Sequence, residues 1–239
     1  MKDYDKDKFV VLVSAGPTAR KVKYSNNYYT CGVNVTPKLI ERTDFWIMND
    51  ACYFQDFSKD DYNKISNMVI PQFPHTVNGY NFHPNKDCDY RKVTEHLPKH
   101  IKVHAFNIQS SKKFNLPIDL KYPFFEARSS NESAIRWLLY NGFKKFISLG
   151  HDPEGEYHTD MFTRPTLGGG SKVIHETIDN LRYSNVNKRI KMAVKEHNCL
   201  FIRLVLPPDC VFDETHLKEC LYLENNTGYF NIEVSNEFK

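Results

Sequence analysis

The sequence predicts an α/β protein with a Rossmann-like, mostly parallel sheet and helices on both faces. The first observation is the apolar, β-branched run at residues 9–13, which ends in the turn Ser-Ala-Gly-Pro-Thr at 14–18. A continuous apolar run is typical of a strand buried on both faces, as in a parallel sheet. The second observation is that two further extended segments, 28–35 and 44–48, also end in polar turn residues. This succession of strands and polar turns is typical of a nucleotide-binding sheet.

The elements that follow in the first half of the chain are assigned from caps and periodicity. A short helix is expected over 37–42 with Thr36 as its cap, because hydroxyl side chains accept hydrogen bonds from the first turn. A longer helix is expected over 58–69, capped by Ser58. Residues 71–100 lack periodicity and are rich in Pro, His, Asn and Asp, so they predict an irregular insertion.

The second half continues the alternation of strands and helices. Gly142 is placed to end a helix over 133–140. Residues 153–185 are polar, contain three consecutive glycines, and indicate a lid. Strands are expected at 101–108, 146–149, 200–206 and 229–234, and helices at 186–197 and 214–221. We therefore expect a single domain over residues 1–239, with an insertion at about 71–100 and a lid at about 153–185.

Composition excludes several classes of protein. The 32 basic and 29 acidic residues leave a net charge of only +3, which argues against a broad nucleic-acid-binding surface. No apolar run is long enough to span a membrane, and the first residues lack the apolar core of a signal peptide. The six cysteines form no Cys-x-x-Cys pair and no zinc-binding spacing. We expect a cytoplasmic protein with reduced thiols, no membrane span and no metal site.

Polar residues recur where the predicted strands end. Asn34 and Asn49 follow the second and third strands, and Gly150-His151-Asp152 follows a later one. Open α/β sheets bind ligands at the carboxyl edge of their strands, so these residues are candidates for one shared cleft. Each asparagine alone is better explained as a turn former or a cap, and it is their shared position at the strand ends that makes a functional role as good an explanation. The pair Asp87 and Asp89 lies in an irregular loop, where a chance pairing explains it better than a metal site.

Several of these motifs resemble a known group of enzymes. The motifs are Val-Ser-Ala-Gly-Pro-Thr at 13–18, Val-Asn at 33–34, Trp-Ile-Met-Asn at 46–49, and the stretch from Arg128 through the helix to Asp152. They resemble the donor-site strands of bacterial sialyltransferases that use CMP-sialic acid, and the glycosyltransferase domain of flagellar motility accessory factors. The likeness covers most of residues 9–50 and 127–207.

The resemblance implies a metal-independent glycosyltransferase with a GT-A-variant-like sheet and no cofactor besides its nucleotide-sugar co-substrate. The donor it implies is a CMP-activated acidic sugar, with a UDP-sugar as second choice, and the acceptor group is a hydroxyl. The residues it places around the nucleotide and its phosphate are Gly16, Thr18, Asn34, Asn49, Ser130, Gly150 and Asp152.

The resemblance also implies catalytic candidates. Tyr157 matches the phosphate-binding tyrosines of these families, and Arg128 lies one position from their arginine. The position of the family's catalytic histidine falls near Tyr183, so His175, or second His158, is the expected general base.

Two other functions stay open: a nucleotide-binding module without catalysis, and a glycosyltransferase that modifies nucleobases of DNA or RNA. The acceptor, whether glycan, small molecule, protein or modified nucleic acid, and the formation of a homo-oligomer are also left open.

Overall fold

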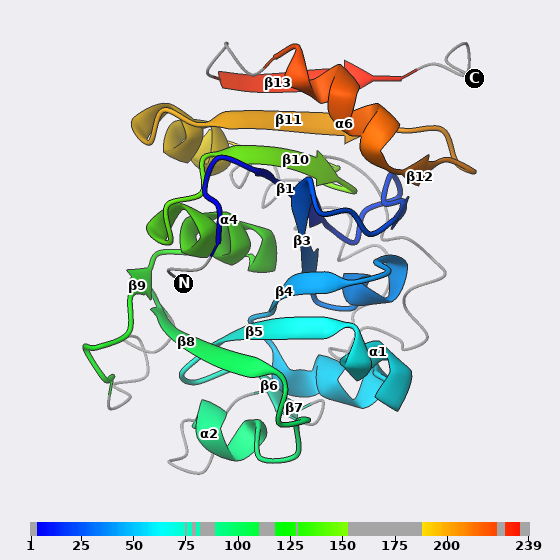
Figure 1. Cartoon of the computed structure of the whole chain (residues 1–239). Helices are drawn as coiled ribbons and strands as arrows, with labels where there is room; N and C mark the ends of the chain where they lie inside the picture. The colour runs from blue at the N-terminus through cyan, green and yellow to red at the C-terminus, as the bar shows by residue number, and fades with distance from the viewer. Residues whose placement is uncertain are drawn as a thin grey trace, which may run out of the picture.

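The computed structural model describes residues 4–74, 76–77, 80–81, 89–109, 118–127, 129–152, 188–223 and 228–234. The strands of its main sheet are, in chain order, β1 (Phe9–Val13), β3 (Tyr28–Val33), β4 (Thr43–Ile47), β5 (Ile65–Pro71), β8 (Lys102–Ile108), β9 (Phe124–Phe125), β10 (Lys145–Leu149), β11 (Leu200–Val205) and β13 (Gly228–Glu233). Their order in space is β13-β11-β10-β1-β3-β4-β5-β8-β9, and every neighbouring pair is parallel (Figure 1). The predicted Rossmann-like parallel sheet is confirmed.

The direction of strand addition reverses at β1. From β1 the chain builds outward on one side through β3, β4, β5, β8 and β9, and then returns to add β10, β11 and β13 on the other side. The loops that follow β1 and β10 therefore leave the sheet side by side at its carboxyl edge. In open α/β sheets, this reversal is where ligands bind.

Shorter elements surround the sheet. Two helices flank its centre, α4 (Ser130–Tyr140) and a helical segment at 188–196, and α6 (Glu214–Leu221) lies near the C-terminus. The remaining elements are β2 (Lys21–Val22), η1 (Thr36–Leu39), η2 (Ala51–Asp56), α1 (Lys59–Asn63), β6 (Thr76–Val77), β7 (Tyr80–Asn81), α2 (Tyr90–Val93) and β12 (Val211–Phe212). Strand β2 pairs with β12, and β6 with β7. Within the described residues, no helix is both long and apolar enough to cross a membrane.

Both faces of the sheet are covered, as the alternation of side chains along β1 shows. Val10 and Leu12 point into a cluster that includes Trp137 of α4 and Ile190 of the 188–196 helix. Phe9, Val11 and Val13 point the other way, into a cluster completed by α6 and the segments around β2 and η1. All five residues of β1 are buried, so the central strand has the continuous apolar sequence that buried parallel strands require.

The helix expected over 58–69 is wrong. Helix α1 covers only Lys59–Asn63, and Ser58 caps it by accepting a hydrogen bond from Asp61 N. The chain then enters β5, between β4 and β8, where Ile65, Met68 and the residues that follow are buried. A short capped turn and a buried strand follow one another with no Gly or Pro between them, so in sequence they resemble one amphipathic helix.

Thr36 is not the cap of the short helix that follows β3. The capping position of η1 belongs to Val35, and Thr36 is fully buried. Its Oγ1 accepts a hydrogen bond from Val33 N at 2.7 Å and donates toward Val13 O at 2.7 Å, which ties the end of β3 to the end of β1. The described part of the predicted insertion contains α2 and the β6–β7 pair. The predicted lid at 153–185 lies outside the described residues.

Candidate functional site

The loops after β1 and β10 are held together by backbone hydrogen bonds. Ser14 N donates to Leu149 O at 2.8 Å, and Gly16 N donates to Gly150 O at 2.9 Å. A Cβ on Gly16 would overlap both the Gly150 carbonyl oxygen and the Asp152 carboxylate. Gly150 has a φ of +70°, which disfavours other residues, and a Cβ there would overlap Ser14 O. The two glycines therefore permit the close approach of these loops.

The carboxylate of Asp152 joins three segments of the chain. It accepts hydrogen bonds from Thr18 N at 2.9 Å and Thr18 Oγ1 at 2.7 Å, and it forms an ion pair with Arg203 at 2.7 Å. Arg203, on β11, also donates from Nε to His151 O at 2.8 Å. Only 6% of the Asp152 side chain is exposed. Asp152 thus positions the β1 loop against the β10 loop and β11, through contacts made within the protein.

Arg203 was not among the residues predicted from the sequence, although a signal for it exists. It is the single charged residue in the apolar run of β11, Leu-Phe-Ile-Arg-Leu-Val. A charged side chain on a buried strand needs a charged or hydrogen-bonding partner. This requirement points to an acidic residue at the same edge of the sheet, and Asp152 is that residue.

The N-terminus of α4 is connected to the end of β4. Ser130 Oγ accepts a hydrogen bond from Asn49 N at 3.3 Å, and Ser133 Oγ donates to Asn49 Oδ1 at 2.8 Å. Ser129 caps the helix by accepting from Glu132 N. Helix α4 leads back into β10 and runs antiparallel to it, so the first turn of α4 lies at the carboxyl edge of the sheet. The unpaired N–H groups in the first turn of a helix attract anions.

The same helix turn also reaches the loops of β1 and β10. Ser14 Oγ donates to Asn131 Oδ1 at 2.9 Å, and Asn131 Nδ2 lies 3.4 Å from His151 Nδ1. All three residues are buried or partly buried at the point where strand order reverses. The prediction missed Asn131 and Ser133, because their role depends on which helix turn faces which loop, and spacing along the chain does not give this.

One asparagine at this edge, Asn34, has an unused hydrogen-bonding group. Oδ1 of Asn34 is buried and has no hydrogen-bond partner among the described residues. Asn34 adopts a left-handed backbone conformation, with φ of 56°, and its carbonyl accepts from Trp46 Nε1 at 2.6 Å. An unpaired buried acceptor is suited to a polar ligand, because unsatisfied buried groups are rare in folded proteins.

A buried acid stabilises the approach of the 188–196 helix to α4. The Glu132 carboxylate is 3% exposed and pairs with Arg136 Nε at 3.0 Å and Arg189 Nε at 2.6 Å. Arg189 also donates to Glu126 O. A carboxylate in the first turn of a helix interacts favourably with the helix dipole. This cluster positions the segment that begins directly after the predicted lid.

The predicted nucleotide-binding residues form two groups in contact plus one separate residue, and the predicted catalytic residues are not described. Gly16, Thr18, Gly150 and Asp152 contact one another, and Asn49 contacts Ser130. Asn34 lies at the end of β3, at the same carboxyl edge, without a described side-chain contact to either group. The five catalytic candidates lie outside the described residues: Arg128, Tyr157, His158, His175 and Tyr183.

Asp89, which lies in the described part of the predicted insertion, has a structural role. Asp89 caps α2 by accepting from Arg91 N at 2.9 Å and forms an ion pair with Arg91 Nε at 2.8 Å. Burial alone would raise the pKa of Asp89, but the hydrogen bonds from Arg91 outweigh burial and hold it below its ordinary value. Within the described ranges, no three His, Cys, Asp or Glu side chains are grouped to share a metal ion.

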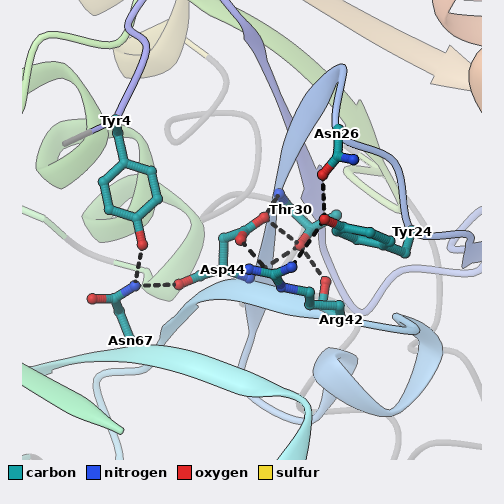
Figure 2. Close-up of polar contacts among 7 residues, drawn as sticks. All are labelled: Tyr4, Tyr24, Asn26, Thr30, Arg42, Asp44 and Asn67. Atoms are coloured by element: carbon teal, nitrogen blue, oxygen red, sulfur yellow. Dashed lines mark hydrogen bonds and ion pairs between the residues drawn. The ribbon is translucent and has the colours of Figure 1, made fainter. Parts of the chain in front are cut away.

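A second polar cluster joins β3, β4 and β5 nearer the amino edge of the sheet (Figure 2). Asp44 accepts from Thr30 N at 2.9 Å, and Arg42 approaches its carboxylate at 3.9 Å. Asn67 Nδ2 donates to Asp44 O at 2.8 Å and to Tyr4 Oη at 2.7 Å. Burial raises the pKa of Asp44 above its ordinary value, and the hydrogen bonds from Thr30 and the charge of Arg42 only partly offset that effect. The cluster's contacts are internal, which indicates a structural role.

Comparisons of the chain with protein-family models, with curated proteins and with solved structures found no match. We therefore infer the function from the position and chemistry of the residues at the carboxyl edge of the sheet.

Proposed function

We propose that this chain is a glycosyltransferase that moves a sugar from a nucleotide-sugar donor to an acceptor hydroxyl without a metal ion. The proposed donor is a CMP-activated acidic sugar, with a UDP-sugar as the second choice. The observation that supports the proposal is the gathering of Gly16, Asn34, Asn49 and Ser130 at the carboxyl edge of the sheet, next to the reversal of strand order. Ligands of open α/β sheets bind at this place.

The donor nucleotide would lie across the ends of β1, β3 and β4. The first turn of α4 offers backbone N–H groups and the positive end of its dipole to a phosphate. Asn34 Oδ1 offers an acceptor to the base or the ribose. Gly16 lets the β1 loop lie against Gly150 and Asp152, which fixes the edge at which the donor would bind.

The reaction we propose is a direct displacement. The acceptor oxygen forms a bond to the anomeric carbon of the sugar while the bond from that carbon to the phosphate oxygen breaks, and CMP leaves. His175, or second His158, takes the proton from the acceptor hydroxyl. Hydroxyls of Tyr157 and Tyr183, or the Arg128 guanidinium, stabilise the charge on the leaving phosphate.

In this proposal, Asp152 is a positioning residue. It fixes the end of the β10 loop through Thr18 and Arg203, only five residues before Tyr157.

The proposal is tested by nucleotide binding and by sugar transfer. A ligand that binds only the folded state raises the melting temperature, so CMP and CMP-N-acetylneuraminic acid should raise it in the presence of EDTA. Asn49→Ala should abolish the shift. Asn141→Ala is the matched control, because Asn141 caps the opposite end of α4 and should leave the shift intact. Mass spectrometry of donor hydrolysis and of a panel of hydroxyl acceptors then measures turnover.

A non-catalytic nucleotide-binding module is the second candidate. One observation favours it: the position that the resemblance matches to the catalytic histidine falls near Tyr183 and Ser184, where this chain has no histidine. Under this alternative CMP binds, and neither transfer nor donor hydrolysis occurs. DNA and RNA oligonucleotides in the acceptor panel test the nucleobase-modifying alternative. Absence of a shift with every nucleotide and nucleotide sugar would contradict both candidates.

A further inference from the structure

Three side chains near the C-terminus form a chain of contacts from a thiol to a carboxylate. Cys210 lies in the turn between β11 and β12, where its N donates to Pro207 O at 3.1 Å. Its Sγ lies 3.3 Å from His216 Nε2, and His216 Nδ1 lies 3.0 Å from Asp213 Oδ1. Many enzymes activate a side chain for attack with this order of groups: a nucleophile, a base, and a group that orients the base.

The carboxylate fixes the protonation of the imidazole. Asp213 caps α6 and accepts from Thr215 N at 2.9 Å, so its position is set by the helix. Burial alone would raise the pKa of Asp213, but its hydrogen bonds outweigh burial and lower the pKa, which keeps the group ionised. Two atoms of Asp213 compete for His216 Nδ1: the backbone N can donate to it at 3.3 Å, and the carboxylate Oδ1 can accept from it at 3.0 Å. The shorter contact to the ionised carboxylate favours a proton on Nδ1, because charge-assisted hydrogen bonds are the stronger ones. The lone pair of Nε2 then faces the Cys210 thiol.

The charges around Cys210 make its reactivity depend on His216. Burial raises the pKa of the Cys210 thiol, and the carboxylates of Asp213 and Glu219 raise it further. Arg20 acts in the opposite direction, by favouring the thiolate. Without a base, this thiol would therefore react more slowly than a free cysteine at neutral pH.

The turn that contains Cys210 borders a cavity, although Cys210 itself is not among the residues that line it. The cavity has a volume of about 410 Å³ and is lined by Arg20, Pro207 and Pro208, among others. Cys210 is half-buried and His216 is 15% exposed. Of the other cysteines, Cys31, Cys199 and Cys220 are buried. Among these four described thiols, Cys210 combines exposure with a base.

We propose that Cys210 is a thiol-modification site that undergoes exchange with low-molecular-weight disulfides, with His216 as its base. His216 Nε2 takes the thiol proton, and the Cys210 thiolate attacks one sulfur of the disulfide. A new S–S bond joins Cys210 to half of the molecule, and the old S–S bond breaks. The other half leaves as a thiolate, which takes the proton from His216. The Cys210 sulfur is oxidised and the departing sulfur is reduced by the same amount, so the exchange needs no other oxidant.

The contrasting explanation is that His216 serves only as part of the helix cap. His216→Gln separates the two, because glutamine at the third helical position preserves a capping box but cannot accept a proton. His197→Gln is the matched control: His197 is exposed, and only its backbone carbonyl contacts a cysteine, Cys199.

The experiment measures site-specific reaction of the full-length chain with iodoacetamide and with glutathione disulfide between pH 6.5 and 8.5, by peptide mass spectrometry. Cys210 should react faster than Cys199 in both reactions. His216→Gln should slow Cys210 at pH 7 by about tenfold, since an unassisted thiol is only a few per cent ionised there. His197→Gln should leave the rate unchanged.

Equal Cys210 rates in the wild type and His216→Gln would overturn the proposal. Asp213→Asn gives a second reading should His216→Gln fail to fold, because asparagine still caps the helix but removes the charge that orients the imidazole. A Cys210 rate unchanged by Asp213→Asn would also contradict the proposal.

Discussion

Removal of the Asp152 carboxylate should destabilise the protein by disconnecting three segments. In Asp152→Ala, Thr18 N, Thr18 Oγ1 and Arg203 Nη2 all lose their acceptor, while Arg203 Nε keeps His151 O. Breaking a buried ion pair from one side costs about 3–5 kcal/mol. Arg203 is 18% exposed, so water relieves part of its loss. We therefore expect a decrease in the free energy of unfolding near the lower end of that range, about 3 kcal/mol.

Urea denaturation of a double-mutant cycle measures this coupling directly. The cycle comprises the wild type, Asp152→Ala, Arg203→Met and the double variant, with the midpoint and slope fitted for each. Each single variant leaves one charge without its partner, so the double variant should be less destabilised than the sum of the two by about 1–3 kcal/mol. Asp209→Ala is the control, because Asp209 is exposed and its removal should change stability by no more than about 0.5 kcal/mol.

Two results would refute this reasoning. A loss below about 1 kcal/mol in Asp152→Ala would mean that the buried carboxylate does not hold the loops together. Additivity of the two single variants within about 0.5 kcal/mol would mean that Asp152 and Arg203 do not act as a pair.

Three further predictions concern pH and turnover. Burial raises the pKa of Asp44, so stability should fall as pH rises from about 4 toward that raised pKa, and Asp44→Asn should remove this fall. Melting curves between pH 4 and 7 check it, and equal slopes for the two proteins would contradict it. Burial lowers the pKa of His104, so stability should be lost as pH falls below about 6.5 toward that lowered pKa. His104→Gln should flatten that loss, and a curve that still follows the wild type would exclude His104 as its source. His175→Ala should bind CMP as the wild type does and lower sugar transfer by about a hundredfold. Full activity of His175→Ala in the transfer assay would show that another residue takes the proton.

The sequence was sufficient for much of the fold because buried parallel strands are locally distinctive. The run that forms β1 is apolar throughout, and the Gly-containing turns after β1 and β10 marked the edge where the loops meet. The failure at residues 58–69 has a local cause as well. A genuine cap at Ser58 starts a helix that ends after Asn63, and the apolar residues beyond it belong to a strand.

Contacts at the site were harder to predict because they depend on pairing across the sheet. Asp152 was identified from its position after a strand, but its partners Thr18 and Arg203 lie 134 and 51 residues away. The isolated charge in β11 was the available signal for Arg203. No comparable signal marks Asn131, which is one polar residue among several in the first turn of α4.

The position of the nucleotide is the central claim, and hydrogen–deuterium exchange with saturating CMP tests it most directly. Bound ligand slows exchange of the backbone amides that it contacts or orders. The account predicts slower exchange at residues 14–18, at Asn49, in the first turn of α4 and at 150–152, with the amino edge of the sheet unchanged. Unchanged exchange throughout, or protection confined to another part of the molecule, would contradict it.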